Sequence, residues 1–81
     1  MHLEIITPDK KVFEGEVTSA VFPGVNGAFE VLNNHAPLIS TLDFGPVRVT
    51  SASGTQFFNI DGGVVEVLDN KIVVLAEAVL S

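Results

Sequence analysis

A chain of 81 residues without cysteine predicts one small domain, residues 1–81, and excludes a disulfide scaffold and a thiolate metal site. Ten acidic against four basic side chains give a net charge of −6, which argues against binding to nucleic acid or anionic lipid. Hydrophobic residues make up 47% of the chain and charged ones only 17%, which favours apolar surface kept for a partner protein. The apolar runs are too short to cross a bilayer and no signal peptide is visible, so we expect a soluble, intracellular protein.

The first half of the chain alternates apolar and polar residues in short runs. This period of two predicts strands, because successive side chains of a strand point to opposite faces of a sheet. Pro8-Asp9, Gly15 and Pro23-Gly24 interrupt the runs. We expect strands at residues 3–7, 11–13, 17–22, 28–32 and 38–42.

The second half continues this pattern and contains the clearest hairpin. Its strands, at residues 64–68 and 71–77, flank Asp69-Asn70, which suits the positive φ angles of a two-residue turn. Further strands are expected at residues 46–51 and 55–60, joined by a tight turn at Ser53-Gly54. About nine short strands at this spacing predict an all-β sandwich or flattened barrel.

Residues that could carry catalysis or bind a metal form no recognisable motif. His2, His35 and carboxylates such as Glu4 and Glu30 lack zinc-ligand spacing, and no serine or cysteine lies in a nucleophile motif. We expect His35, in the sequence NNHAP, to be a turn histidine whose ring bonds nearby backbone, in preference to a contact residue. The sequence therefore predicts no catalytic residue, no metal and no cofactor.

Pairs of acids and of glycines have equally plain explanations. Glu14 with Glu16 and Asp61 with Asp69 are pairs expected in an acidic chain, and the sequence does not show whether either shares a cleft. Gly62-Gly63 predicts a turn or bulge instead of a phosphate loop, because no helix follows it.

Residues 23–39, PGVNGAFEVLNNHAPLI, stand out because glycine, proline and asparagine are concentrated there. Asn26-Gly27 is a strong hairpin-turn signal, and no charged residue lies between Pro23 and Phe29. This uncharged tip is either a simple turn or a surface that rests against another protein.

The same stretch, followed by GPVRV and IDGGVVEVLDNKIVVLAEAV, resembles the epsilon subunit family of the bacterial F-type ATP synthase. The similarity is to the family's N-terminal β-sandwich domain. Its motifs are G-x-x-G, here Gly24 and Gly27, then H-A-P-L at residues 35–38, G-G-x-x-E-V at 62–67, and an apolar strand ending in L-A and an acid at 73–77. The resemblance covers essentially all 81 residues.

The resemblance implies a flattened ten-stranded β-sandwich or barrel of short antiparallel strands, and a rotor subunit that is not a catalyst. In the family this domain lies at the foot of the central stalk, packs on the gamma subunit and rests on the polar loops of the c-ring. It helps couple ion-driven c-ring rotation to ATP synthesis in the catalytic head. Carried onto this sequence, the implied c-ring contact is Val25, Asn26, Gly27 and Ala28, and the implied gamma contact is His35 and Leu38. Relatives often carry an acidic or polar residue at the position of Ala28, so Glu30 is the nearby candidate for that charge.

The resemblance also implies a peripheral location on the cytoplasmic face of the bacterial inner membrane, through the complex and without insertion into the membrane. Most family members continue into a C-terminal helical hairpin that inhibits ATP hydrolysis or binds ATP. The sequence to Ser81 does not contain it, so neither activity is inferred. Without its partner, the domain is expected to form weak dimers through the gamma-binding flank.

Two other interpretations stay open. A ligand-binding or enzymatic β-sandwich predicts a concave cavity with convergent polar groups. A generic intracellular interaction module predicts the same fold with a different protein partner.

Overall fold

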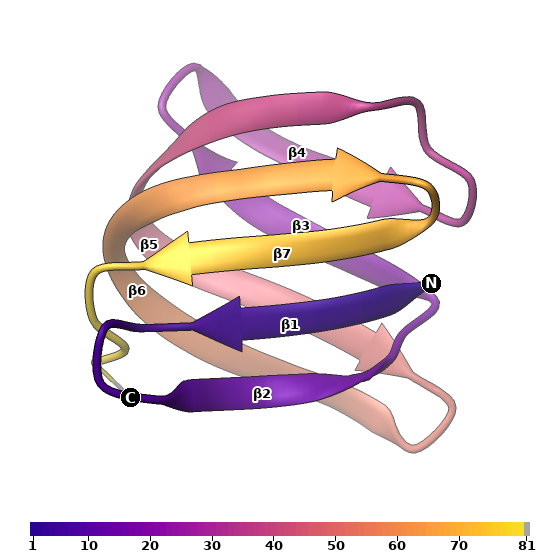
Figure 1. The fold of residues 1–81 in the computed structure, drawn as a ribbon, viewed down its shortest axis with the longest axis horizontal. Helices are drawn as coiled ribbons and strands as arrows, with labels where there is room; N and C mark the ends of the chain where they lie inside the picture. The colour runs from indigo at the N-terminus through magenta and orange to yellow at the C-terminus, as the bar shows by residue number, and fades with distance from the viewer. Residues whose placement is uncertain (81) are drawn as a thin grey trace.

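The computed structural model describes residues 1–80 and has seven β-strands in this part of the chain. They are β1 (His2–Ile6), β2 (Lys11–Glu16), β3 (Ser19–Gly24), β4 (Gly27–Leu32), β5 (Leu38–Ser51), β6 (Gly54–Leu68) and β7 (Lys71–Ala76). All seven belong to one sheet, in the order β2-β1-β7-β6-β5-β3-β4 (Figure 1). β1 and β7 are parallel, and every other neighbouring pair is antiparallel.

The sheet folds over on itself because its two longest strands bend. β5 and β6 form one hairpin whose register is continuous from the pair Leu38–Val67 to the pair Ser51–Gly54. Figure 1 shows both strands curving around one side of the molecule. One half of the hairpin lies with β7, β1 and β2 in a front layer, and the other half lies with β3 and β4 in a back layer.

The expected all-β class is confirmed, and all neighbouring strands except β1 and β7 are antiparallel, as expected. The expected ten short strands are wrong in number, because residues 1–80 form seven strands and two of these, β5 and β6, are long. We expected strand breaks near Gly45-Pro46 and at residues 61–63, whereas the backbone stays paired there and only bends. Glycine makes the bend possible: Gly63 has φ 150°, and a Cβ on it would collide with the carbonyl oxygen of Leu75 in β7. Within residues 1–80 the outermost strands, β2 and β4, do not pair with each other, so the sheet is not closed.

Apolar side chains from both layers meet in one core. Each strand places alternate residues inward, as the period of two predicts. The largest fully buried side chains are Phe22, Leu3, Ile5, Ile60, Ile72, Val31, Val47, Val49, Val65, Val67 and Val74. Two ring pairs, Phe13 with Phe58 and Phe22 with Phe29, lie in or against this core with centroids 5.5 and 5.6 Å apart. Among the described residues no polar or charged side chain is buried, so the core offers no buried acid or base.

Short connections tie the layers together at their edges. Between β2 and β3 the amide of Val17 donates to the carbonyl of Met1 at 2.8 Å, and the amide of Thr18 donates to that of Thr50 at 2.8 Å. After β7, Val79 forms an isolated bridge with Ile60 of β6. No helix in residues 1–80 has the length and apolar character to cross a bilayer.

Candidate interaction surfaces

The outer face of the front layer divides into two halves of different chemistry. Cross-strand partners point to the same side of a sheet, so the register defines the rows of this face. Partners run from Ile6 through Leu75 and Val64 to Thr41 in one row. We call Ile6, Ile39, Val64, Leu68, Val73 and Leu75, together with Glu66 among them, the apolar half. We call His2, Glu4, Lys11, Glu14, Glu16 and Lys71 the charged half.

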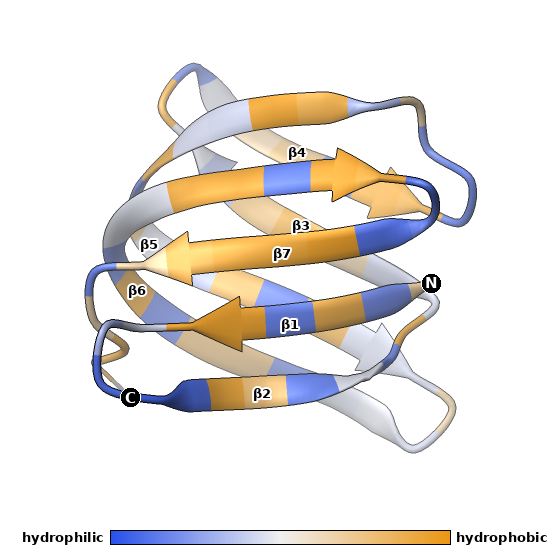
Figure 2. Cartoon of the chain, viewed as in Figure 1, coloured by the Kyte–Doolittle hydropathy of each residue, from blue (hydrophilic) through white to orange (hydrophobic). Residues whose placement is uncertain are grey.

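The apolar half is open to solvent. The side chain of Ile39 is 71% exposed, Leu75 is 55% exposed, and Val64 and Leu68 are also exposed. Figure 2 shows β7 and the adjoining part of β6 as apolar along most of their length. An antiparallel sheet with one face in water normally carries polar residues on that face. An exposed area that is apolar apart from Glu66 is typical of a surface that binds another protein.

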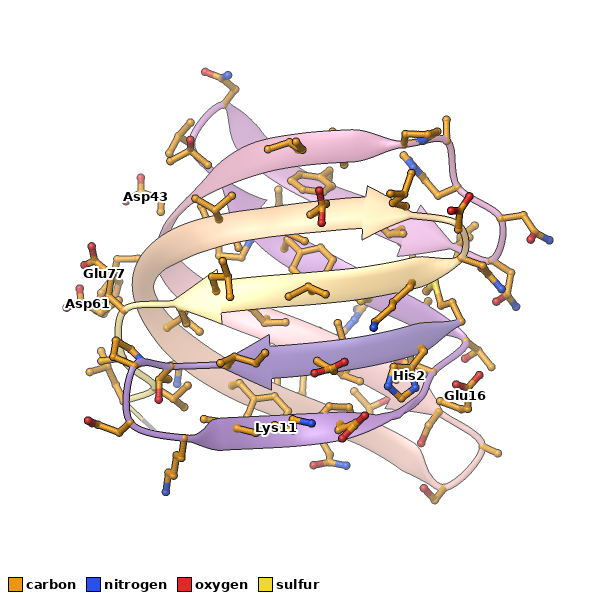
Figure 3. All side chains as sticks on the ribbon, in the orientation of Figure 1. His2, Lys11, Glu16, Asp43, Asp61 and Glu77 are labelled. Atoms are coloured by element: carbon orange, nitrogen blue, oxygen red, sulfur yellow. The ribbon has the colours of Figure 1, made fainter. Side chains whose placement is uncertain are left out.

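The charged half is organised around His2. The Nε2 atom of His2 lies 2.9 Å from Glu14 Oε2, and its Nδ1 atom lies 3.1 Å from Glu16 Oε2. Figure 3 shows His2 and Glu16 side by side at one end of β1 and β2. The hydrogen bonds to Glu14 and then to Glu16 raise the pKa of His2 above its ordinary 6.5. Bonds from Lys11 and then from His2 lower the pKa of Glu14 below its ordinary 4.5.

The same cluster offers donor atoms to a metal ion but is already neutralised by lysines. The ligand atoms of His2, Glu4 and Glu14 lie within 4.8 Å of one another. Lys11 Nζ lies 2.7 Å from Glu14 and 3.5 Å from Glu4, and Lys71 Nζ lies 3.4 Å from Glu4. A dication there would meet two ammonium groups at short range, and that repulsion opposes its binding. We therefore interpret the charged half as a network of surface ion pairs.

The predicted tip joins β3 to β4. Val25, Asn26, Gly27 and Ala28 are all exposed, and the amide of Val25 donates to the carbonyl of Thr41 at 3.2 Å, which ties the tip to β5. The predicted hairpin is confirmed, but its turn residues are Val25 and Asn26, and only Gly27 takes a positive φ, of 122°. The Asn26-Gly27 signal therefore placed the turn one residue too far towards the C-terminus.

His35 and Leu38 follow β4, at the end of that strand away from its first residue, Gly27. Leu38 begins β5 three residues before Thr41, whose carbonyl accepts from the amide of Val25, so about 10 Å of strand separates Leu38 from the residue that the tip contacts. The expected turn role of His35 is confirmed, because its Nδ1 lies 2.7 Å from the carbonyl oxygen of Ala36 and can donate to it. Leu38 is half-buried and packs against the core, while its neighbour Ile39 points outward.

A hollow beside the ends of β1 and β7 tests the enzymatic interpretation. It is lined by Ile6, Thr7, Pro8, Leu75, Ala76 and Glu77. Glu77 is the one charged residue of that lining, and the Thr7 hydroxyl already donates to the carbonyl of Lys10 at 3.1 Å. These residues do not supply the convergent polar groups that a catalytic or ligand pocket needs.

Comparison with known protein families identifies the family to which this fold belongs. Residues 1–81 match the family model of the ATP synthase delta/epsilon chain β-sandwich domain. The chain belongs to this family. The sequence resemblance is thereby confirmed, and this family member is a non-catalytic chain of the synthase.

Relatives of this delta/epsilon chain support the assignment. It is 45% identical over 78 residues to the ATP synthase epsilon chain of Chlorobium limicola, covering 95% of this chain and 89% of the relative. It is 47% identical over 76 residues to that of Pelotomaculum thermopropionicum, covering 94% of this chain and 57% of the relative. The chain thus spans most of the first relative and little more than half of the second.

Solved structures show the same fold. A chain of the Euglena gracilis mitochondrial ATP synthase OSCP/F1/c-ring assembly superposes with a TM-score of 0.89 at 21% identity, covering 96% of this chain and 51% of that one. A chain of the Tetrahymena thermophila central stalk and c-ring assembly gives a TM-score of 0.86 at 20% identity, covering 100% and 66%.

Sequence reasoning expected apolar surface for a partner but did not locate either half of the outer face in this delta/epsilon chain. The signal for the apolar half was present, because β6 ends in VVEVL and β7 reads KIVVLA, so apolar residues occupy both faces of each strand. The charged half left no signal, because His2 and its partners in β2 are brought together only by strand pairing.

Proposed function

We propose that this chain is a rotor subunit of the central stalk, binding the gamma subunit and the c-ring and coupling ion-driven c-ring rotation to ATP synthesis in the catalytic head. It would lie peripherally on the cytoplasmic face of a bacterial inner membrane. The observation that carries the proposal is the apolar half of the outer face, in a chain whose family is non-catalytic.

The apolar half is suited to a stable protein contact. Its exposed side chains come from three adjacent strands, β5, β6 and β7, so they are fixed relative to one another. Covering such apolar side chains in an interface removes apolar area from water, which favours binding. We propose that the gamma subunit covers this half, with Ile39 as its most exposed member and His35 and Leu38 at its border.

The tip is suited to a second contact, beside Thr41 at the border of the apolar half. Its four exposed residues carry no charge, and the Phe22–Phe29 ring pair packs on the strands behind them. The proposed substitute charge, Glu30, lies 3.7 Å from Arg48 and is therefore engaged in an ion pair. We propose that the c-ring contacts Val25, Asn26, Gly27 and Ala28 mainly through shape and backbone groups. The close-packed core behind both contacts deforms little under load, as transmission of torque requires.

Calorimetric titration of the chain into purified gamma subunit tests the first contact. We expect one-to-one binding with a dissociation constant below about 1 μM. Ile39→Asp should weaken it at least about tenfold, because an aspartate would be buried in an apolar interface. Phe57→Asp is the matched control, since Phe57 is 61% exposed on the outer face of the back layer. Equal effects of the two substitutions would contradict the proposed interface.

Cysteine cross-linking in the assembled synthase tests the second contact. The chain contains no cysteine, so Asn26→Cys introduces a single thiol at the tip. We expect it to cross-link to a c-ring subunit, whereas Ala52→Cys, in the exposed turn between β5 and β6, should not. Binding to gamma without any cross-link from the tip would instead favour the alternative function, a generic interaction module with another arrangement of partners.

A further inference from the structure

We propose that His2 is a proton-dependent clasp that fastens the edge strand β2 to β1. β2 stands at the end of the strand order and, within residues 1–80, has β1 as its one neighbour in the sheet. The pairing of these strands is regular from His2–Glu16 to Ile5–Phe13 and shifts register between Ile5 and Ile6. The His2 contacts therefore support the regular end of a strand that has no second neighbour.

The hydrogen-bond geometry makes this clasp depend on protonation. Ionised carboxylates only accept hydrogen bonds, and a neutral imidazole carries one N–H. The two ring nitrogens of His2 lie 2.9 Å from Glu14 Oε2 and 3.1 Å from Glu16 Oε2. Both contacts are hydrogen bonds at the same time only when His2 carries two ring protons. Loss of one proton leaves a nitrogen lone pair facing a carboxylate and removes one of the two bonds.

The charged groups around His2 limit the effect to this edge. They are Glu4 on β1, Lys11, Glu14 and Glu16 on β2, Lys71 on β7 and the N-terminal amine, which lies 3.6 Å from Glu16 Oε1. Each of the three carboxylates keeps at least one of the other cations when His2 is neutral. Deprotonation should therefore loosen the pairing of β2 with β1 without unfolding the domain.

The direction of the effect follows from the raised pKa of His2. A histidine with a higher pKa in the closed than in the open strand stabilises closure fully below the open-state pKa. That contribution is lost as the pH rises through the closed-state pKa. The edge strand should be held in mildly acidic solution and released as the pH rises.

NMR on the unmodified chain tests the clasp without requiring a variant. We expect His2 to titrate above 6.5. The amides of β2 should lose exchange protection, corrected for intrinsic rates, between about pH 5.5 and pH 8.5. The fold-loss of protection should equal the ratio of the His2 acid dissociation constants in the open and closed states, because both belong to one thermodynamic cycle.

Variants show whether His2 is responsible. In His2→Gln the protection of β2 should no longer depend on pH, while His35→Gln, whose ring contacts its own turn, should behave as the unmodified chain. Glu14→Gln should lower the pKa of His2 more than Glu16→Gln does, because the bond to Glu14 is the larger cause of the shift. Titration of His2 at or below 6.5, or pH-dependent protection that persists in His2→Gln, would overturn the proposal.

Discussion

The two halves of the outer face lie on one sheet and share its rows. They differ in whether their side chains already have interaction partners within the chain. On the charged half, Glu4 and Glu14 lie opposite each other on β1 and β2, and lysine and histidine side chains neutralise both. On the apolar half, Leu75 lies opposite Val64, and both remain exposed to water.

This difference teaches where a partner gains most. In a network of exposed ion pairs, the charged groups already interact with one another and with water. A partner protein that covers the network therefore gains little binding free energy. Exposed apolar side chains have no such compensation, and covering them removes apolar area from water. The apolar half is therefore the expected interface. The charged half is expected to stabilise the chain itself.

The largest effect is expected where the backbone supports the apolar half. A Cβ in Gly63→Ala would collide with the backbone of β7, so the substitution should lower the free energy of unfolding by about 3 kcal/mol or more. Gly54→Ala is the control, because Gly54 also has a positive φ, 127°, but open space around it. It should cost about 1–2 kcal/mol. Urea unfolding followed by circular dichroism measures both, and equal losses would contradict the role of close approach.

The second effect tests whether the exposed apolar half makes the isolated chain self-associate. At about 1 mM the isolated chain should form weak dimers through this surface, with a dissociation constant of about 1 mM. Leu75→Glu should abolish them, since it places a charge among apolar side chains. Phe57→Glu, on the back layer, should leave them intact. Sedimentation velocity distinguishes these outcomes, and a monomer at all concentrations would show that this half does not self-associate.

Local sequence signals predicted much of the fold. Alternating residues identified the strands, and Asp69-Asn70 identified its turn correctly, with φ angles of 52° and 60°. Strand breaks were overpredicted because Gly45-Pro46 and residues 61–63 look like turns in sequence. In the folded chain the paired strand holds the backbone through both segments, so glycine there produces a bend instead.

The candidate surfaces were harder to predict, because they depend on which side of the sheet a residue faces. Leu38 and Ile39 are adjacent and both apolar, yet the first packs against the core and the second is the most exposed large hydrophobic residue described. A shift of one residue reverses the face, and sequence locates strand starts less well than that. The His2 network depends on pairing between β1 and β2, which no local pattern contains.

The third effect compares one glutamate from each half. Glu4, with its side chain 14% exposed, contacts both Lys11 and Lys71, so Glu4→Gln should lower the free energy of unfolding by about 0.5–1 kcal/mol at low salt. The loss should shrink at about 1 M salt, where charges are screened. Glu66→Gln, in the same row but opposite Ile39 and Val73, should change stability by less than about 0.5 kcal/mol. Urea unfolding at two salt concentrations provides the measurement, and a loss for Glu4→Gln that is insensitive to salt would argue against ion pairing as its cause.

The smallest effect concerns the titration of Glu14, in the charged half, at acidic pH. The pKa of Glu14 is lowered first by its bond with Lys11 and then by that with His2. Its contribution to stability is therefore present above the ordinary value of 4.5 and is lost as the pH falls through the folded-state pKa. Lys11→Met should move the Glu14 titration, followed by carboxyl NMR, back towards 4.5. Lys10→Met removes an equal charge one residue away, so a comparable shift in that variant would mean that the general field of the lysines lowers the pKa, and that the Lys11–Glu14 hydrogen bond does not.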